Sequence, residues 1–275
     1  MKTINLKSNL YLVIFLSFLS SCTDVIDVDV PDAGPRLIVQ ASIDWEKGTP
    51  GNNQTIYLKT SKPYFDSSPS PVVTGASVTI TKDNDGTVFE FTDQNDGSYT
   101  TSNFIPEIGT SYTLNIVSNG ESYEAKETLI GFTEITKVSQ EDGFTEDEYR
   151  VRVSFNDPEE EENYYLGEFI QENVALPSLR AVRDEFVNGN EAFILHFNEN
   201  NTVGTSVDIR VFGISKQYYF YIEELISQAG AGGGPFQAPP AQLKGNCINI
   251  ANPEEEVLGY FRLSQLERTS YTIVE

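Results

Sequence analysis

The feature that most limits the fold of this chain is a repeated alternation of apolar and polar residues in short stretches. Leu37, Val39, Ala41 and Ile43 alternate with more polar neighbours, which is the period-2 pattern of a strand with one buried face. Residues 149–155 repeat the pattern as Tyr-Arg-Val-Arg-Val-Ser-Phe. Each such strand must bury one face against a second layer, so we expect a mainly β fold.

The turns between these stretches are of the kind that joins neighbouring antiparallel strands. Asp-Asn-Asp-Gly at 83–86, Asp-Gly at 96–97 and Asn-Gly at 119–120 all contain residues that tolerate positive φ. Strands at this spacing, joined by such turns, are typical of an antiparallel sandwich.

Three short motifs in the first half of the chain are similar to motifs of a known type of module. They are Gly-Ala-x-Val at 75–78, Asp-Gly-x-Tyr at 96–99 and Gly-x-x-Tyr-x-Leu at 109–114. In this order they resemble the prealbumin-like, carboxypeptidase-regulatory-like modules of bacterial surface proteins, which are structural or binding units. We therefore predict two antiparallel β-sandwich-type units, an Ig-like or prealbumin-like one over residues 36–130 and a second β-rich domain over 131–275.

One helix is predicted in the second unit, over about 215–229. Ser215 is a suitable N-cap, and Tyr218 and Ile222 begin an apolar face at helical spacing. The Gly- and Pro-rich stretch at 230–240 that follows is expected to be an exposed loop.

The N-terminus has the pattern of a secretory signal. Two lysines precede an apolar run over residues 10–19, which is too short to cross a membrane core. Leu-Ser-Ser-Cys at 19–22 then resembles the bacterial lipoprotein signal, in which the cysteine is diacylated and becomes the first mature residue. We predict a signal peptide over 1–21 and lipid attachment at Cys22; the alternative is an accidental cysteine.

The next residues, 22–35, are expected to be an acidic tether. Asp24, Asp27 and Asp29 resemble the export signal of surface lipoproteins in the Bacteroidota. An ordinary solvated linker would have the same composition, so both interpretations stay open.

The charge of the chain excludes several classes of partner. The full sequence has 18 basic and 41 acidic residues, and two of the basic ones lie in the signal, so the mature chain carries 16 − 41, a formal −25. Such a polyanion repels nucleic acid and anionic membrane surfaces alike. Membrane attachment must therefore come from the lipid, for which two acyl chains suffice.

No catalytic residue or cofactor is predicted. His196 is the single histidine, and its strand pattern puts it on one face with Ile194, where we expect it to be hydrogen-bonded or solvent-facing. Neither a Gly-x-Ser-x-Gly turn nor a His/Cys cluster for zinc is present in the sequence. A pair of carboxylates in a glycan hydrolase stays an alternative, since acidic residues are abundant.

Two turns contain oxygen ligands near a glycine and are weak calcium candidates. An EF-hand loop also needs a glutamate at its twelfth position, which here is Gln94 in one turn and Phe104 in the other. Hairpin turns therefore explain these residues better than metal sites. The candidate ligands are Asp83, Asp85, Asp93 and Asp96.

Other residues are candidates for contacts or for packing. Trp45 follows a strand and precedes a loop, where a binding aromatic could lie, and Pro235 and Phe236 belong to the exposed loop. Cys247 has no partner for an intramolecular disulfide once Cys22 is acylated, and we expect it to be a small packed residue.

Taken together, landmarks along the whole mature chain resemble family 4249 of domains of unknown function, found in the Bacteroidota. These landmarks are Cys22 followed by Asp-Val-Ile-Asp at 24–27, the strand at 37–41, Gly-Ala at 75–76, Gly-x-Tyr at 97–99, Asp-Pro at 157–158, Asn-Tyr-Tyr at 163–165, the helix at 218–225, Pro-Phe at 235–236, Gly-Asn at 245–246 and Leu-Gly-Tyr-Phe at 258–261. Cys247 departs from the family pattern after Gly-Asn.

The resemblance implies an outer-membrane lipoprotein, commonly encoded beside a TonB-dependent receptor. Together with the anchor and the β composition, this leads us to expect a protein that faces the cell exterior and assists such a receptor in nutrient uptake. The resemblance brings no catalytic residues. We therefore expect a lipid-anchored binding or accessory module; the alternatives are a carboxylate-dependent surface hydrolase of glycans and a purely structural or adhesive protein.

Overall fold

Fifteen strands and one helix make up the part of the chain that the computed structural model describes, residues 34–275 except 64, 144, 146–147, 160, 173, 186–188 and 231–242. In chain order they are β1 (Leu37–Glu46), β2 (Gln54–Thr60), β3 (Ser77–Lys82), β4 (Val88–Asp93), β5 (Ser98–Thr101), β6 (Ser111–Ser118), β7 (Glu121–Thr128), β8 (Ile135–Asp142), β9 (Tyr149–Asn156), β10 (Tyr164–Gln171), β11 (Ser178–Arg183), β12 (Glu191–His196), β13 (Ser206–Ile214), α2 (Lys216–Gly230), β14 (Ile248–Asn249) and β15 (Leu258–Thr272).

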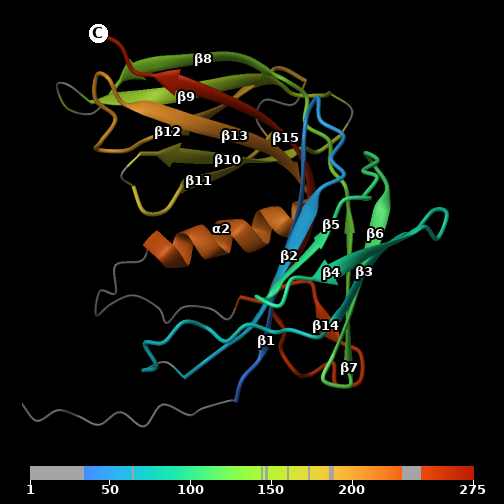
Figure 1. The fold of residues 1–275 in the computed structure, drawn as a ribbon. Helices are drawn as coiled ribbons and strands as arrows, with labels where there is room; N and C mark the ends of the chain where they lie inside the picture. Colours follow the sequence, from blue (N-terminus) through green and yellow to red (C-terminus); the bar gives the residue numbers. More distant parts are fainter. Residues whose placement is uncertain are drawn as a thin grey trace, which may run out of the picture. The chain divides into compact units, whose positions relative to one another are not determined.

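Two sheets hold all of these strands. A 12-stranded sheet has the order β11-β10-β13-β15-β1-β2-β5-β4-β3-β6-β7-β14, and a 3-stranded sheet has the order β12-β9-β8. The large sheet curls so that β3, β6 and β7 face β1, β2 and β5 (Figure 1). The mainly β prediction is confirmed.

The first core lies inside this curl. Val39 and Ile43 of β1 and Ile56 of β2 meet Ile80 of β3 and Leu114 of β6, and all five are fully buried. They occupy alternate positions of their strands, as the sequence pattern predicts. This unit is a β-sandwich built from a single sheet folded back on itself.

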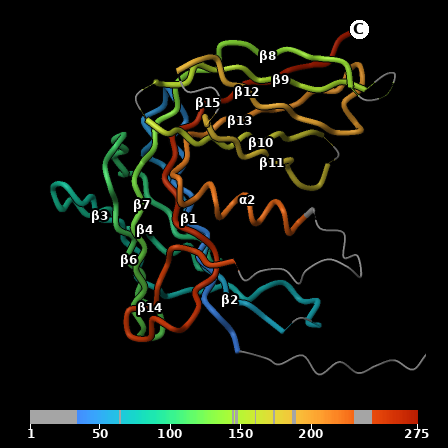
Figure 2. Tube along the Cα trace, turned by 180° about the vertical axis from the view of Figure 1, so that it is seen from behind, coloured from blue at the N-terminus to red at the C-terminus, as the bar shows by residue number. Residues whose placement is uncertain are grey.

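The second core lies between the other end of the large sheet and the small sheet. Val151 and Phe155 of β9 and Ile194 of β12 pack against Phe169 of β10 and Val211 of β13. Figures 1 and 2 show β8, β9 and β12 on one side of β10 and β13, with α2 on the opposite side. Helix α2 therefore covers the outer face of this second sandwich.

The helix confirms the prediction for 215–229. The backbone N–H of Tyr218 donates to the Oγ of Ser215 at 3.1 Å, which is the N-cap hydrogen bond. Tyr218 and Ile222 turn toward the sheet and pack with Phe212 and Tyr260 in a third apolar cluster.

Strand β15 is long enough to pair with strands of both sandwiches. Its first part pairs with β1 in parallel, from Ile38–Leu258 to Glu46–Leu266, and its last part pairs with β13 antiparallel. The expectation of purely antiparallel sheets is therefore wrong at one pair. The reason is that β15 enters the sheet opposite the first residues of β1, so that both strands run the same way.

The proposed boundary at residue 130 falls between the two cores. Strand β15 nevertheless contributes Phe261 and Leu263 to the first core, and Tyr271 packs against the second. As a result, Gly34–Glu275 forms one compact unit. Independent folding of 36–130 and 131–275 stays a prediction.

The Gly-Asn and Leu-Gly-Tyr-Phe landmarks interlock at the start of β15. Asn246 accepts from the backbone N–H of Phe261 through its Oδ1 and donates to the Phe261 carbonyl, both at 2.8 Å. Gly259 has φ +88°, and a Cβ there would lie 2.0 Å from the carbonyl oxygen of Val39. The chain therefore needs glycine where β15 first meets β1.

The tyrosine motifs of the first half have a structural explanation. The Tyr99 hydroxyl donates to the Val73 carbonyl at 3.0 Å and accepts from the Ala76 N–H at 3.2 Å. The Tyr112 hydroxyl joins Ile105 and Glu107 in the same way. Each buried tyrosine thus attaches a loop to the sandwich. Its hydroxyl forms hydrogen bonds with backbone groups that burial removes from water.

The predicted turns are also confirmed. Asn119 and Gly120 have φ +53° and +83°, as a two-residue turn between β6 and β7 requires, and Gly86 and Gly97 have φ +74° and +85°. No described helix has the length and apolar character needed to cross a membrane.

We predict that Gly259→Ala costs about 3 kcal/mol of unfolding free energy, because a left-handed backbone and a clash with Val39 act together. Gly204→Ala is the matched control: its φ is +90°, but no atom lies within 4 Å of the added Cβ. Gly204→Ala should therefore lower the unfolding free energy by only about 1 kcal/mol. Urea unfolding followed by circular dichroism measures both, and equal losses would contradict the interlock.

Candidate functional site

The surface most suited to binding is the face of the large sheet that points away from both sandwich cores. On β15, Phe261 points into the first core and Arg262 to the other side, and on β2 Tyr57 points outward next to buried Leu58. The registers Ser42–Arg262 and Gln40–Tyr57 place these outward positions beside each other. We call the outward residues of β10, β13, β15, β1, β2, β5 and β4 the open face, although α2 covers the part of it around Arg262.

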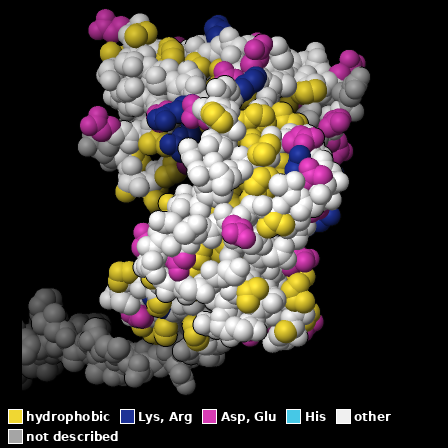
Figure 3. All heavy atoms as spheres, turned by 45° about the vertical axis from the view of Figure 1, so that its right-hand side comes forward, with side chains coloured by type: hydrophobic (Ala, Val, Ile, Leu, Met, Phe, Trp, Pro, Cys, Tyr) yellow, Lys and Arg dark blue, Asp and Glu magenta, His cyan; other side chains and the backbone are white. Residues whose placement is uncertain are grey.

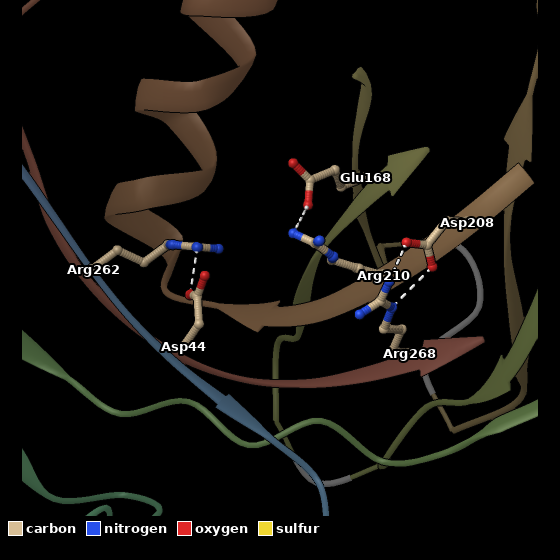
Figure 4. Close-up of polar contacts among 6 residues, drawn as sticks. All are labelled: Asp44, Glu168, Asp208, Arg210, Arg262 and Arg268. Carbon is tan, nitrogen blue, oxygen red and sulfur yellow. Dashed lines mark hydrogen bonds and ion pairs between the residues drawn. The ribbon is translucent and has the colours of Figure 1, made fainter. Parts of the chain in front are cut away.

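Three arginine–carboxylate pairs lie on this face next to α2 (Figure 4). Arg210 of β13 meets Glu168 of β10 at 3.1 Å, across a direct register pair. Arg268 of β15 holds Asp208 of β13 through two hydrogen bonds, of 3.0 and 2.6 Å. The third pair, Arg262 with Asp44, is treated next. We call these six residues the charged band.

Arg262 is the buried member of the charged band. Its side chain is 7% exposed, and one terminal nitrogen, Nη2, donates to Asp44 Oδ1 at 2.6 Å. The guanidinium carbon lies 4.5 Å from the centroid of the Phe212 ring and 5.2 Å from that of Tyr218, as cation–π contacts require. Within the described residues, its Nε and Nη1 have no hydrogen-bond partner. Asp44 is thus its main electrostatic support.

Next to the charged band the open face carries fewer charges. At this point of β2 the buried side chain of Gln54 bonds the neighbouring backbone: it donates to the carbonyls of Asp44 and Gly51 and accepts from the N–H of Asp44. Beyond it lies a groove of about 520 Å³, which we call the polar groove. Its lining residues are Asn53, Gln54, Thr55, Glu90, Thr92, Gln94, Thr100, Thr101, Ser102 and Asn103.

Trp45 lies at the edge of the first core, and its side chain is in contact with its neighbours. Its ring is half-buried against core residues, and its Nε1 donates to the Thr49 carbonyl at 2.9 Å. A Cβ on Gly51 would lie 2.6 Å from the ring, so the loop is closed over the indole. A ligand role for Trp45 stays a prediction. Cys22, Pro235 and Phe236 lie outside the described residues.

The four calcium candidates have their carboxylates engaged in turns and ion pairs. Asp83 pairs with Lys126 at 2.7 Å, and Asp93 accepts from the backbone N–H of Gly75 at 2.6 Å. Asp85 and Asp96 accept from backbone N–H groups two residues ahead. In the described ranges no three His, Cys, Asp or Glu side chains converge as metal ligands would.

His196 is placed differently from the prediction. It shares a face with Ile194 as expected, but its side chain is neither solvent-facing nor hydrogen-bonded. The imidazole is fully buried and stacks on the ring of Phe169, with the two ring centroids 4.4 Å apart. In the described part of the chain neither ring nitrogen has a partner. Burial lowers the pKa of the imidazole to about 4, with a smaller contribution from Arg180.

Glu127 is a buried carboxyl that connects the two sandwiches. It lies on β7 and accepts hydrogen bonds from the hydroxyls of Ser215, at 2.9 Å, and Tyr260, at 3.3 Å. Burial raises the pKa of this carboxyl, and these hydrogen bonds act in the opposite direction. Because Ser215 is the N-cap of α2, Glu127 fixes the start of the helix against β7.

Cys247 is a packed residue, as expected. Its thiol belongs to the first core, and burial raises its pKa to about 12, so that almost no thiolate forms at neutral pH. In the space-filling view of Figure 3, Lys and Arg side chains gather beside a hollow, whereas Asp and Glu side chains are spread more widely over the surface.

A family model for a domain of unknown function, DUF4249, matches residues 23–270. The chain belongs to the DUF4249 family. Among curated protein sequences, none matches this DUF4249 chain.

Two solved structures from chicken are similar in part. A segment of two fibronectin type-III domains from tenascin is 14% identical over 65% of this chain and 90% of that chain, with a TM-score of 0.22. The FN1–FN3 domains of CNTN1 are 13% identical over 64% of this chain and 62% of that chain, with a TM-score of 0.26. TM-scores this low carry no argument about the DUF4249 chain.

Sequence patterns did not reveal the charged band. Arg262 stands in an otherwise apolar stretch, Tyr-Phe-Arg-Leu, which is the one local sign that its strand has a second covered face. Its partner Asp44 is far away in the sequence and follows only from the pairing of β15 with β1.

We predict that Asp44→Ala lowers the unfolding free energy by about 2 kcal/mol or more, because it leaves the buried Arg262 without its carboxylate. Asp208→Ala is the control: it breaks a pair whose Arg268 is 49% exposed to solvent, and it should cost clearly less than Asp44→Ala. Adding Arg262→Met to Asp44→Ala should recover most of the loss. If Asp44→Ala and Asp208→Ala are equally mild in urea unfolding, Arg262 does not depend on Asp44.

We predict a loss of stability in mild acid that His196 causes. Since the pKa of His196 is about 4 in the folded chain against 6.5 ordinarily, the unfolded chain binds more protons between these values. Stability is therefore fully present above pH 6.5 and falls toward pH 4, by about 2 kcal/mol at pH 5. In His196→Leu, the difference in unfolding free energy between pH 7.5 and pH 5 should shrink by that amount. Parallel pH profiles would contradict this.

Proposed function

We propose that this chain is a lipid-anchored protein of the outer membrane that displays a non-catalytic binding module at the cell surface. The observation that carries the proposal is the Leu-Ser-Ser-Cys signal at 19–22, with the acidic stretch that follows. Diacylation of Cys22 would anchor a chain whose formal charge of −25 after processing, 16 basic minus 41 acidic residues, gives no attraction to lipid head groups.

The state of the reactive side chains supports a binding role over a catalytic one. The imidazole of His196 is enclosed beside Phe169, and the thiol of Cys247 is packed in the first core. Glu127 has a raised pKa, as an acid catalyst would, but its carboxyl is buried and bonded to Ser215 and Tyr260. All three groups are buried, so their reactive atoms have little contact with solvent.

The partner we propose is a TonB-dependent receptor, with the module assisting uptake of a nutrient. This step follows from the resemblance to surface lipoproteins of the Bacteroidota. The open face supports it, because a rigid sheet surface with both charged and neutral regions can bind a ligand or a protein without rearranging.

The test uses the full-length chain with a C-terminal tag, expressed in its native host and fed an alkyne analogue of palmitate. We expect the wild type to incorporate the label and Cys22→Ser to lose it, because the diacylated thiol is gone. Cys247→Ser is the matched control, since Cys247 is the only other cysteine, and it should keep the label.

Affinity purification from detergent-solubilised outer membranes completes the test. We expect the labelled wild type to bring down a β-barrel receptor. Label that survives Cys22→Ser would remove the anchor from the proposal, and purification without any receptor would remove the uptake role.

A further inference from the structure

We propose that the polar groove on β2, β5 and β4 binds a neutral oligosaccharide. The inference rests on the proposed surface role and names the class of ligand that the exposed module would take. It starts from a contrast in charge: the chain carries 41 acidic residues, yet of the groove's lining residues only Glu90 is ionisable. On a polyanion, a surface with a single ionisable residue is suited to a ligand without charge.

The lining has the chemistry that sugar hydroxyls require. Apart from Glu90, every lining residue is Thr, Ser, Asn or Gln, whose hydroxyls and carboxamides both donate and accept. The volume of about 520 Å³ lies within the range typical of ligand sites. An apolar ligand would leave these polar groups unpaired, and an anion would meet Glu90 and the net negative charge of the chain.

Several of these groups are available to a ligand. Among the described residues, the side chains of Asn53, Thr55, Thr92 and Ser102 make no hydrogen bond within the protein, and Asn53, Thr92 and Ser102 are exposed. The register pairs Thr55 with Thr100 and Thr100 with Thr92, so three hydroxyl-bearing residues lie in a row across β2, β5 and β4. Such a row can follow the hydroxyls of a short sugar chain.

The remaining polar groups hold the groove in shape. Gln94 donates from its amide to the Thr100 hydroxyl and the Thr92 carbonyl, both at 2.9 Å. Asn52 donates to the Ser102 carbonyl at 2.8 Å, which fixes the two loops at the end of the groove. A groove that is already rigid loses little conformational entropy when a ligand binds.

An exposed aromatic ring completes the site. Tyr57 is the next outward-facing residue of β2 after Thr55, and 47% of its surface is exposed. Its direct neighbour across β5 is Ser98, and across β1 it is Gln40, so the ring stands among small or polar groups. A tyrosine ring in this position can stack on the apolar face of a sugar while the groove binds its hydroxyls.

The test is affinity electrophoresis of the full-length protein in mild detergent, in native gels that contain one soluble polysaccharide each. The neutral probes are arabinoxylan, mixed-linkage β-glucan, glucomannan and pullulan, and the anionic probe is polygalacturonate. We expect at least one neutral polymer to retard the wild type and polygalacturonate not to. For that polymer, Tyr57→Ala and Thr55→Glu should each weaken binding at least tenfold.

Two matched controls separate the groove from the rest of the surface. Phe220→Ala removes an equally exposed aromatic ring from α2, at 49% exposure, and Ser122→Glu adds a charge to an exposed position of β7. Both should bind as the wild type does. Unfolding midpoints of all four variants confirm that they are folded.

The inference is overturned if no neutral polymer retards the protein, if polygalacturonate binds more tightly, or if both groove variants bind normally. Because the gels use isolated protein, none of these outcomes depends on acylation or on a receptor. A groove that fails here would leave the proposed anchor and partner to stand or fall by the labelling and purification.

Discussion

The fold depends on the pairing of β15 with two strands at once. Its first residues run parallel to β1 and its last ones antiparallel to β13, so one strand is shared by both sandwiches. Each face of β15 is in use, with Phe261 in the first core and Tyr260 under α2. Gly259 lets the two backbones approach at the start of this ladder, since any side chain there would collide with Val39.

A strand covered on both faces explains why charges are buried here. Arg262 takes an outward position of β15 that would be exposed in a lone sandwich, but α2 covers it through Tyr218. Desolvation of the guanidinium is offset by Asp44 and by two aromatic rings. Glu127 is the counterpart on β7, where it accepts from the helix cap Ser215. The helix is thus held to the first sandwich by polar contacts and to the second by apolar ones.

Local structure could be predicted from the sequence, whereas the pairing of distant segments could not. Strands such as β1 and β9, the hairpin turns and the helix with its Ser215 cap follow from periodicity and turn chemistry that span a few residues, whereas no pattern indicated β8 or β11. The parallel β1–β15 pair and the Arg262–Asp44 contact join residues more than two hundred positions apart. His196 shows the limit within one strand: its face was predicted correctly, but its enclosure comes from Phe169 on a strand of the other sheet.

The two regions of the open face differ because of how the chain distributes its few basic residues. With 18 basic residues against 41 acidic ones, most carboxylates cannot be paired. Three of the arginines are nevertheless gathered beside α2, and each pairs with a carboxylate there; only Arg262 is covered by the helix. The exposed strands β2, β5 and β4 contain no arginine, and their outward residues are mostly Thr, Ser and Tyr. The groove on these strands therefore carries a single carboxylate, Glu90, and leaves hydroxyls and amides as most of the groups a ligand would meet.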